Sequence, residues 1–201
     1  MNVITVDSGT TNTRATLWKD DCPLYTASRP VGVRMTAIEG NNNALKQAVS
    51  QVIQEALSYG NKKAPAILLA SGMITSGLGL VEIPHLCAPI TFDGLAKGII
   101  KKKIEGLNYD QPIYFIPGIK NTDQKISLGS CSAMDIMRGE ETETVAMAVL
   151  SNSLKSSVFV LPGSHTKFVL LGENEEIQGC FTTLAGELLS VLTSDTILAS
   201  S

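Results

Sequence analysis

Over the first thirty positions, apolar and polar residues alternate in short runs separated by polar turns. Alternation with a period of two indicates strands that bury one face, and clusters of Gly, Asn, Asp and Thr between such runs indicate turns. The turns fall at residues 7–12 and 19–21. The sequence therefore predicts an N-terminal β-meander with strands at residues 2–6, 14–18 and 23–29.

The pattern becomes helical between Leu45 and Leu57, where apolar residues recur every three or four positions. A single apolar stripe with this period is typical of a helix that packs against a core. Gly60 follows at a position that suits a glycine just beyond a helix end. The sequence predicts one clear helix here, ending before Gly60.

Later segments alternate between strand-like and helix-like patterns. Residues 66–70 are apolar throughout, which is typical of a strand covered on both faces. We expect helices at 92–104 and 139–150, and a further strand at 112–116. Strands that alternate with helices after an initial meander predict a mixed α/β layer architecture.

A second meander is expected from residue 157 onward, and it weakly repeats the first. When the sequence is compared with itself at an offset of 154 positions, both copies show a strand, a loop with Gly next to Ser or Thr, and a second strand. The matched segments are 4–6 with 158–160, 9–10 with 163–164, and 15–17 with 169–171.

A third strand of the second copy is expected at residues 177–182. Similarity at one long offset favours duplicated domains over a solenoid, although chance also produces such short matches. We therefore expect a first domain over residues 1–155 and the start of a second domain over 156–201.

Composition excludes several classes of protein. Of the 201 residues, 44% are hydrophobic and only 17% are charged, which excludes a disordered chain. The formal net charge is −3, and the one basic run, residues 101–103, is expected to be a solvated helix face, so we expect no nucleic-acid partner. No apolar run approaches the roughly 20 residues that a membrane helix needs, so no membrane partner is expected.

The four cysteines are widely spaced, and the chain has two histidines. These spacings match neither a zinc site nor a compact disulfide framework. Reduced thiols are typical of cytoplasmic proteins, so a cytoplasmic location is expected.

The first turn carries chemistry suited to an anion. Gly9 permits a close approach of the backbone, and Thr10, Thr11 and Asn12 supply hydrogen-bond donors. Asp7 offers a carboxylate for a hydrated Mg²⁺. The same residue types also occur in ordinary hairpins, so this loop is weak evidence when taken alone.

The second loop, residues 162–167, could hold the same phosphate chain from the other side. Gly163, Ser164 and Thr166 would supply donors, and Lys167 would supply a point charge. Phosphoryl transfer depends mostly on positioning and charge neutralisation. As a symmetric pair, the two loops favour a phosphate-binding function.

Several segments resemble a known family. Residues 7–14 (DSGTTNTR) are similar to the first phosphate motif of the sugar kinase, Hsp70 and actin superfamily. The whole chain resembles the 2-keto-3-deoxygalactonate kinases (2-dehydro-3-deoxygalactonokinases), most specifically at 137–142 (MRGEET) and 161–167 (LPGSHTK). Residues 70–73 (ASGM) also resemble the family, and 183–188 (TLAGEL) adds a weaker match.

The resemblance implies an actin-like ATPase (ribonuclease H-like) fold, with a first domain of β-meander plus helices and the first strands of a similar second domain. It also implies that Asp7 helps to hold Mg²⁺. The sugar-acid side of the site would be formed by Ser71, Gly72 and Met73. The residues implied to contact ATP phosphates are Gly9, Thr10, Thr11, Asn12, Gly163, Ser164, Thr166 and Lys167.

The general base is less well defined, with Asp135 and Glu140 as the two candidates. Arg138 is a natural partner for the substrate carboxylate because its guanidinium forms a bidentate fork. These three residues could instead serve only to stabilise the start of the following helix. That structural role is favoured for Glu141 and Glu143, which suit the positive end of a helix.

The resemblance implies a reaction that transfers the γ-phosphate of ATP to the 6-hydroxyl of 2-keto-3-deoxygalactonate in galactonate catabolism. Alternatives are a kinase for another sugar, or a sensor or scaffold that keeps the fold without catalysis. Members of the family continue beyond the segment that matches residue 201, and the adenosine motif lies in that further part. For this chain by itself we expect weak ATP binding, poor turnover and self-association through exposed sheet surface.

Other catalytic motifs fit poorly. Cys131, with His85 or His165 as base, loosely resembles a nucleophile elbow, but a buried inert cysteine is favoured. The sequence contains no P-loop motif, and residues 77–79 do not match the dinucleotide fingerprint.

Overall fold

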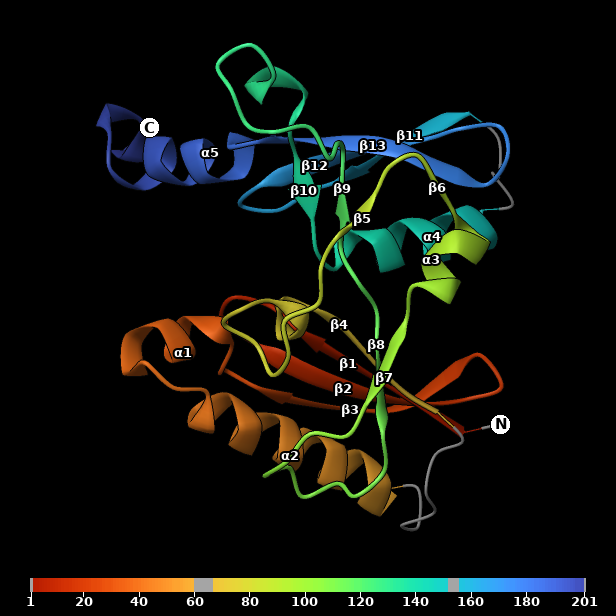
Figure 1. Ribbon diagram of the computed structural model, residues 1–201. Coiled ribbons are helices and arrows are strands. Elements are labelled where there is room, and N and C mark those ends of the chain that lie inside the picture. Colours follow the sequence, from red (N-terminus) through yellow and green to blue (C-terminus); the bar gives the residue numbers. More distant parts are fainter. Residues whose placement is uncertain (1, 60–66, 152–155, 201) are drawn as a thin grey trace. The chain divides into compact units, whose positions relative to one another are not determined.

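The computed structural model describes residues 2–59, 67–151 and 156–200 (Figure 1). The chain divides into two compact units, called here unit 1 and unit 2. Unit 1 comprises Met1–Pro84 and Leu95–Gly118, and unit 2 comprises His85–Gly94 and Ile119–Ser201. The sequence analysis expected a domain boundary after residue 155. The division into compact units differs, because Ile119 onward groups with the second meander.

Unit 1 is built on a six-stranded sheet with the order β3-β2-β1-β4-β8-β7. Its first three strands form the predicted antiparallel meander. The strands expected at 66–70 and 112–116 are present as β4 and β8, and they continue the sheet in parallel. The strands are β1 (Asn2–Ser8), β2 (Thr13–Lys19), β3 (Cys22–Arg29), β4 (Ile67–Gly72), β7 (Ile100–Lys102) and β8 (Ile113–Phe115).

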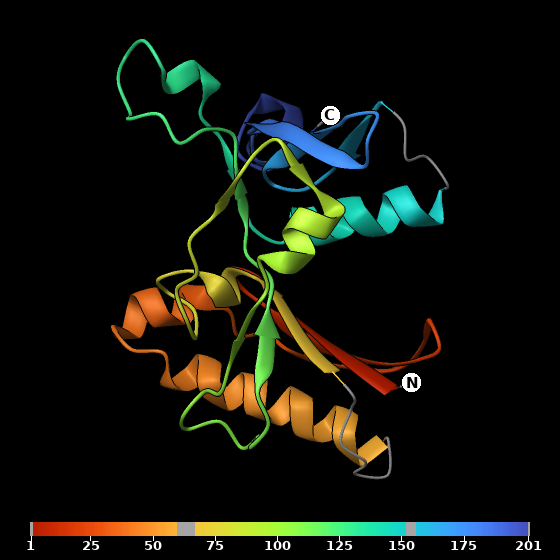
Figure 2. The ribbon, with the colours of Figure 1, turned by 45° about the vertical axis from the view of Figure 1, so that its right-hand side comes forward.

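The predicted helix is confirmed as α2 (Asn43–Tyr59), which runs along one face of this sheet (Figure 2). Leu45, Val49 and Ile53 of its apolar stripe are fully buried in the same core as inward side chains of the meander such as Ile4. Each fully buried aliphatic side chain of this size contributes about 1.5–3 kcal/mol. Gly60, the expected residue beyond the helix end, lies outside the described residues.

The helix expected at 92–104 is wrong in its second half. Helix α3 (Phe92–Lys97) ends before Gly98, and the chain then forms strand β7, which pairs with β8. Glycine weakens a helix interior, and pairing with β8 gives residues 100–102 a complete set of ladder partners on one side. The basic run therefore begins on an exposed edge strand rather than on a helix face.

The outer face of the unit 1 sheet carries Trp18. Ala15 and Leu17 on β2 point toward α2 and are buried, whereas Trp18 points to the opposite face. Its indole N–H donates to the Thr5 hydroxyl across the strand pair at 2.8 Å. Two short elements complete unit 1, namely α1 (Val33–Glu39) and η1 (Met73–Thr75).

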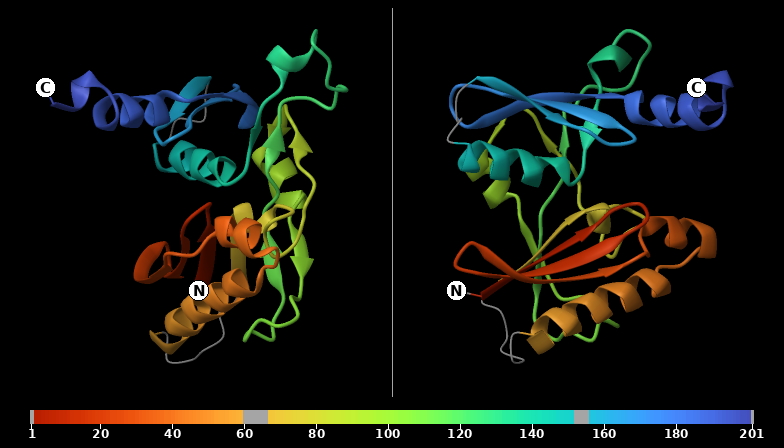
Figure 3. Two further views of the ribbon diagram at one scale, coloured as in Figure 1. Left: turned by 90° about the vertical axis from the view of Figure 1, so that its left-hand side faces the viewer. Right: turned by 180° about the vertical axis from the view of Figure 1, so that it is seen from behind.

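Unit 2 contains the predicted second meander, seen from two sides in Figure 3. The meander strands, with β6, form one sheet in the order β11-β12-β13-β6, and a second sheet has the order β10-β9-β5. Its strands are β5 (Leu86–Cys87), β6 (Ile90–Thr91), β9 (Ile119–Lys120), β10 (Ile136–Met137), β11 (Ser157–Leu161), β12 (Thr166–Leu171) and β13 (Glu176–Thr183). Its helices are η2 (Cys131–Ala133), α4 (Glu140–Leu150), α5 (Ala185–Ser194) and η3 (Ile197–Ser200).

The two meanders differ by one residue in their loops. Ser8 pairs with Thr13 in the first hairpin, and Leu161 pairs with Lys167 in the second, so the second loop is one residue longer. The shift of 154 positions therefore holds for the second strands but not for the first. The expected match of 4–6 with 158–160 is wrong, because Ile4 corresponds to Ser157 in the pairing.

The outer surface of unit 2 is apolar. Phe168 stacks on Phe181 at 4.5 Å between ring centroids, and Val158 and Val160 on β11 are exposed. Helix α5 has no buried residue. No helix in the described part of the chain is long and apolar enough to span a membrane.

Candidate active site

The first loop is held by a buried pair of hydroxyls. Ser8 and Thr13 are both fully buried, and their side-chain oxygens lie 2.9 Å apart. Thr13 also donates to the carbonyl of Val31 at 2.7 Å. The amide of Gly9 donates to the carbonyl of Asn12 and closes the turn. The residues at the tip, 10–12, are exposed, so their donors face outward.

Asp7 lies beside the segment expected to bind the sugar acid. Strands β1 and β4 are parallel, and Asp7 is in register with Ser71, at the carboxyl ends of both strands. Gly72 has φ +81°, and a Cβ there would lie 2.8 Å from Asp7 Oδ1. Glycine is therefore required at 72 for both conformation and space. Open α/β sheets bind ligands at this edge.

A glycine that the sequence analysis missed supports the first loop from behind. A Cβ on Gly32 would lie 2.4 Å from the carbonyl oxygen of Gly9, which no side chain could tolerate. The next two residues begin α1, and the amides of Val33 and Arg34 donate to the carbonyls of Gly9 and Thr10. The loop is thus fixed by the start of α1.

The second loop has the same support. A Cβ on Gly186 would lie 2.0 Å from the carbonyl oxygen of Gly163, and the amide of Glu187 donates to the carbonyl of Ser164. Gly32 and Gly186 are themselves separated by 154 positions, so the internal repeat contained the signal that could have identified them. Residues 162–165 of this loop are exposed.

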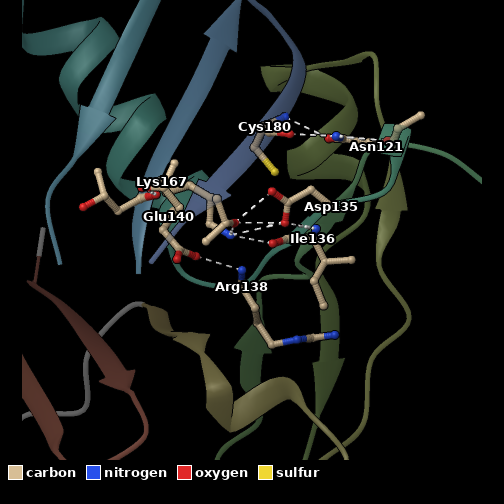
Figure 4. Close-up of polar contacts among 11 residues, drawn as sticks. Asn121, Asp135, Ile136, Arg138, Glu140, Lys167 and Cys180 are labelled. Atoms are coloured by element: carbon tan, nitrogen blue, oxygen red, sulfur yellow. Dashed lines mark hydrogen bonds and ion pairs between the residues drawn. The ribbon is translucent and has the colours of Figure 1, made fainter. Parts of the chain in front are cut away.

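Lys167 does not face the loop. It is only 5% exposed, and its ammonium contacts the Ile136 carbonyl at 2.7 Å and the Thr182 hydroxyl at 2.6 Å (Figure 4). Asp135 Oδ1 lies 3.7 Å from the same nitrogen. The expected phosphate contact by Lys167 therefore differs from the structure, because this side chain is turned into the interior.

Asp135, a candidate base, belongs to this same cluster. The Thr182 hydroxyl lies 2.8 and 3.0 Å from its two carboxylate oxygens, and the amide of Ile136 donates to Oδ1 at 2.7 Å. Asn121 fastens the neighbouring strands, because its side-chain amide pairs with the backbone N–H and C=O of Cys180. The Asp135 carboxylate is thus engaged in hydrogen bonds and an ion pair that hold neighbouring segments of unit 2 together.

Arg138 contacts His85. One terminal guanidinium nitrogen lies 3.2 and 3.1 Å from the two ring nitrogens of His85. Burial, together with the positive charges of Arg138 and Lys120, lowers the pKa of His85 to about 4. A neutral imidazole at pH 7 can accept a hydrogen bond from Arg138 without charge repulsion. The sequence analysis had not linked these two residues.

The start of α4 is organised by two glutamates that fold back onto the chain. Glu140 accepts the amide of Arg138 at 2.9 Å, and Glu141 accepts the amide of Gly139 at 2.9 and 2.8 Å. Gly139 has φ +120°, a conformation open to glycine. Glu141 is fully buried, and burial raises its pKa to about 7. The structural role expected for Glu141 is supported, although its carboxyl is buried rather than solvated.

The expectation of a buried Cys131 is wrong. Cys131 is exposed in η2, and its thiol donates to the Leu128 carbonyl at 3.3 Å. His85 is engaged with Arg138, and His165 contacts Ser164 and Glu187. All four cysteines are free thiols. No cluster of three His, Cys, Asp or Glu side chains suited to a metal occurs within residues 2–59, 67–151 and 156–200.

Comparison with known proteins gives a consistent result. The family model for 2-keto-3-deoxy-galactonokinase matches residues 7–201. The 2-dehydro-3-deoxygalactonokinase of Escherichia coli (strain K12) is 26% identical over 201 residues, which is 98% of this chain and 58% of that protein. The chain therefore spans somewhat more than half the length of this curated relative.

Solved structures show the same fold. A Sinorhizobium meliloti protein, provisionally named as a 2-dehydro-3-deoxygalactonokinase, aligns with a TM-score of 0.72 at 23% identity over 98% of this chain and 59% of its own. The Ppx/GppA phosphatase of Aquifex aeolicus aligns with a TM-score of 0.55 at 11% identity over 96% and 55%. The expected actin-like α/β fold is confirmed.

Proposed function

Because the chain belongs to the 2-keto-3-deoxy-galactonokinase family, we propose that it serves in transferring the γ-phosphate of ATP to the 6-hydroxyl of 2-keto-3-deoxygalactonate. The observation that carries the proposal is the repeated construction of the two Gly-Ser/Thr loops. Each is closed by a hairpin, approached by a glycine without clearance for a side chain, and bonded to the start of a helix.

The first loop is proposed to contact phosphate oxygens of ATP through the exposed side chains of Thr10, Thr11 and Asn12. Gly9, whose amide and carbonyl are bonded within the fold, is proposed to let the phosphate approach the loop closely. Asp7 is proposed to hold Mg²⁺, since Mg²⁺ prefers carboxylate and water oxygens. When bound, the ion would neutralise charge on the transferred phosphate. An exposed carboxylate at the carboxyl end of β1 fits that donor set.

The second loop is proposed to supply the same chemistry through Gly163, Ser164 and Thr166. These residues lie at or beside the exposed tip, as the matching residues of the first loop do. Lys167 is left out of this group because its ammonium is turned inward. Oriented backbone amides and hydroxyls bind phosphate without a further reorganisation cost.

From the family resemblance, Ser71, Gly72 and Met73 of unit 1 are proposed as contacts of the sugar acid. Within unit 2, the guanidinium of Arg138 is proposed to receive the substrate carboxylate. A planar fork matches a carboxylate in geometry as well as charge. Neutral His85 supports this role, because its contact with one guanidinium nitrogen holds the fork in place.

Glu140 is proposed as the general base in preference to Asp135. Asp135 already accepts hydrogen bonds from Thr182 and Ile136 and faces Lys167. Glu140 is half-buried in the first turn of α4, beside Arg138, and accepts the Arg138 amide through Oε2. A carboxylate there would take the proton of the sugar hydroxyl as the phosphoryl group transfers.

The test is Mg²⁺-dependent ADP formation by the full chain, with and without 2-keto-3-deoxygalactonate. We expect substrate-dependent ADP formation that Asp7→Ala abolishes and that Glu140→Gln lowers by about 10²–10⁴-fold, the usual contribution of a general base. Asp110→Ala is the matched control, because Asp110 is an exposed carboxylate in an ion pair with Lys103. An equal rate of ADP formation with and without the sugar acid would overturn the proposal.

A cytoplasmic setting is part of the proposal and is supported by the four free thiols. The choice of sugar acid is tested in the same assay. Epimers that differ at one hydroxyl should be poorer substrates, because a site that hydrogen-bonds a hydroxyl rejects an analogue that leaves its buried polar groups unpaired.

A further inference from the structure

Lys167 occupies a position where a cation is costly. It is the first inward-facing residue of β12, and Val169 and Leu171 follow it on the same buried face. A buried ammonium is retained only when it is paired and hydrogen-bonded. Its partners therefore indicate what the residue does.

The ammonium has three hydrogens, and three acceptors surround it. They are the Ile136 carbonyl at 2.7 Å, the Thr182 hydroxyl at 2.6 Å and the Asp135 carboxylate at 3.7 Å (Figure 4). An ammonium donates three hydrogen bonds and accepts none. The two shorter contacts are hydrogen bonds and the third is an ion pair, so the ammonium is engaged by partners inside the unit.

The charge is balanced within the same cluster. The Thr182 hydroxyl accepts from Lys167 and donates to Asp135, so it links the two charged groups that lie 3.7 Å apart. Asp135 in turn precedes β10, and its carbonyl accepts the amide of Asn121. Lys167 thus connects the strand after the second loop with the segment 135–138.

That segment leads directly to Arg138. Ile136, whose carbonyl binds Lys167, is followed by Met137, which is 1% exposed and anchors β10 in the core. Arg138 comes next and meets His85. Any shift of β10 relative to β12 would therefore move the base of the Arg138 side chain.

We propose that Lys167 is a positioning residue, which ties segment 135–138 to the strand of the second phosphate loop and so sets where Arg138 receives the substrate carboxylate. This inference rests on the proposed function. It assigns Lys167 to the sugar-acid end of the reaction, although the residue lies in the sequence motif of the phosphate loop.

The first test compares the binding of both ligands by calorimetry in the full chain, for wild type, Lys167→Met and Lys167→Arg. We expect Lys167→Met to weaken the affinity for the sugar acid about tenfold or more, because the contact of Arg138 with that ligand is disturbed. The affinity for ATP·Mg²⁺ should change by less than about threefold, because this contact involves the sugar acid alone. Lys167→Arg keeps the charge, so its affinity for the sugar acid should lie between those of wild type and Lys167→Met. Lys103→Met removes an exposed lysine and should change neither affinity.

A weakening of ATP equal to or larger than that of the sugar acid would overturn the inference, since a phosphate ligand predicts that result. Sugar-acid binding without any phosphoryl transfer would instead contradict the proposed function and leave the positioning role in place. The two failures are therefore distinguishable.

The second test needs no ligand. Lys167→Met leaves the Asp135 carboxylate without its cation, so adding Asp135→Asn should raise the melting temperature above that of Lys167→Met alone. If the effects of the two substitutions on the melting temperature are additive, Lys167 and Asp135 are not coupled and the inference fails.

Discussion

The two hairpin loops share a backbone plan but are secured by different residues. In the first, Thr13 is the first buried residue after the loop, and it bonds to Ser8 and to the Val31 carbonyl. In the second, Lys167 takes that place and reaches Asp135, Ile136 and Thr182. The short hydroxyl joins its own hairpin to the segment just before α1, whereas the long ammonium reaches a carboxylate, a carbonyl and a hydroxyl on other segments of unit 2. Similar loops can thus depend on unlike parts of the fold.

The helices that follow the loops also differ in support. Gly32 leads into α1, which buries Val33 and Thr36. Gly186 lies at the start of α5, which has no buried residue. The same close approach of glycine to loop is therefore fixed in unit 1 and free to relax in unit 2. The predictions below use these differences, from the largest expected effect to the smallest.

Replacing the two glycines by alanine should separate the loops most clearly. Gly32→Ala should destabilise the chain by about 1–3 kcal/mol, the usual cost of overpacking, because its Cβ would meet the Gly9 carbonyl at 2.4 Å. Gly186→Ala should cost less, since α5 can move away. Denaturant unfolding measures both, and Gly129→Ala, with only one neighbour at 4.0 Å, is the control. A larger loss for Gly186→Ala would contradict this comparison.

Removing the buried hydroxyl of the first hairpin should have a smaller effect. Thr13→Val keeps the shape but leaves Ser8 and the Val31 carbonyl without their partner, which should cost about 1 kcal/mol. Thr16→Val is the matched control on the same strand, because its hydroxyl pairs with Thr26 at the exposed face. Equal melting temperatures for the two variants would show that the buried pair does not secure the loop.

The buried carboxyl of Glu141 should give a change that depends on pH. Its pKa is raised from 4.5 to about 7 by burial, so the folded chain holds a proton that the unfolded chain has lost between these values. Its contribution to stability is therefore present below about pH 4.5 and is lost as pH rises toward 7. Glu141→Gln should gain stability relative to wild type between pH 5 and pH 8, as followed by thermal melts. Glu143→Gln, at an exposed site in the same turn, should show no such trend.

Local pattern predicted those parts of the fold that packing did not override. The stripe from Leu45 to Leu57 specified α2 because one face was continuously apolar. The segment after Lys97 was wrongly predicted as helix. Gly98 ends the helix, and β8, which is distant in sequence, pairs with residues 100–102. No local signal predicts that pairing.

The site was predictable in its loops and less so in its support. The residue types at 7–12 and 162–166 indicated both loops, yet a repeat counted without gaps concealed the extra residue in the second one. The alternation of Lys167 with Val169 and Leu171 already favoured an inward lysine. The contact of Arg138 with His85 joins residues 53 positions apart, which no spacing rule connects.

The placement of Trp18 has a spectroscopic consequence. It is the single tryptophan, and the four tyrosines, Tyr25, Tyr59, Tyr109 and Tyr114, lie in unit 1 as well, so unit 2 holds no residue of either kind. Intrinsic fluorescence therefore reports on unit 1 alone, whereas far-ultraviolet circular dichroism reports on the whole chain. Comparing the two signals during unfolding would reveal, without any label, whether the units melt together or one after the other.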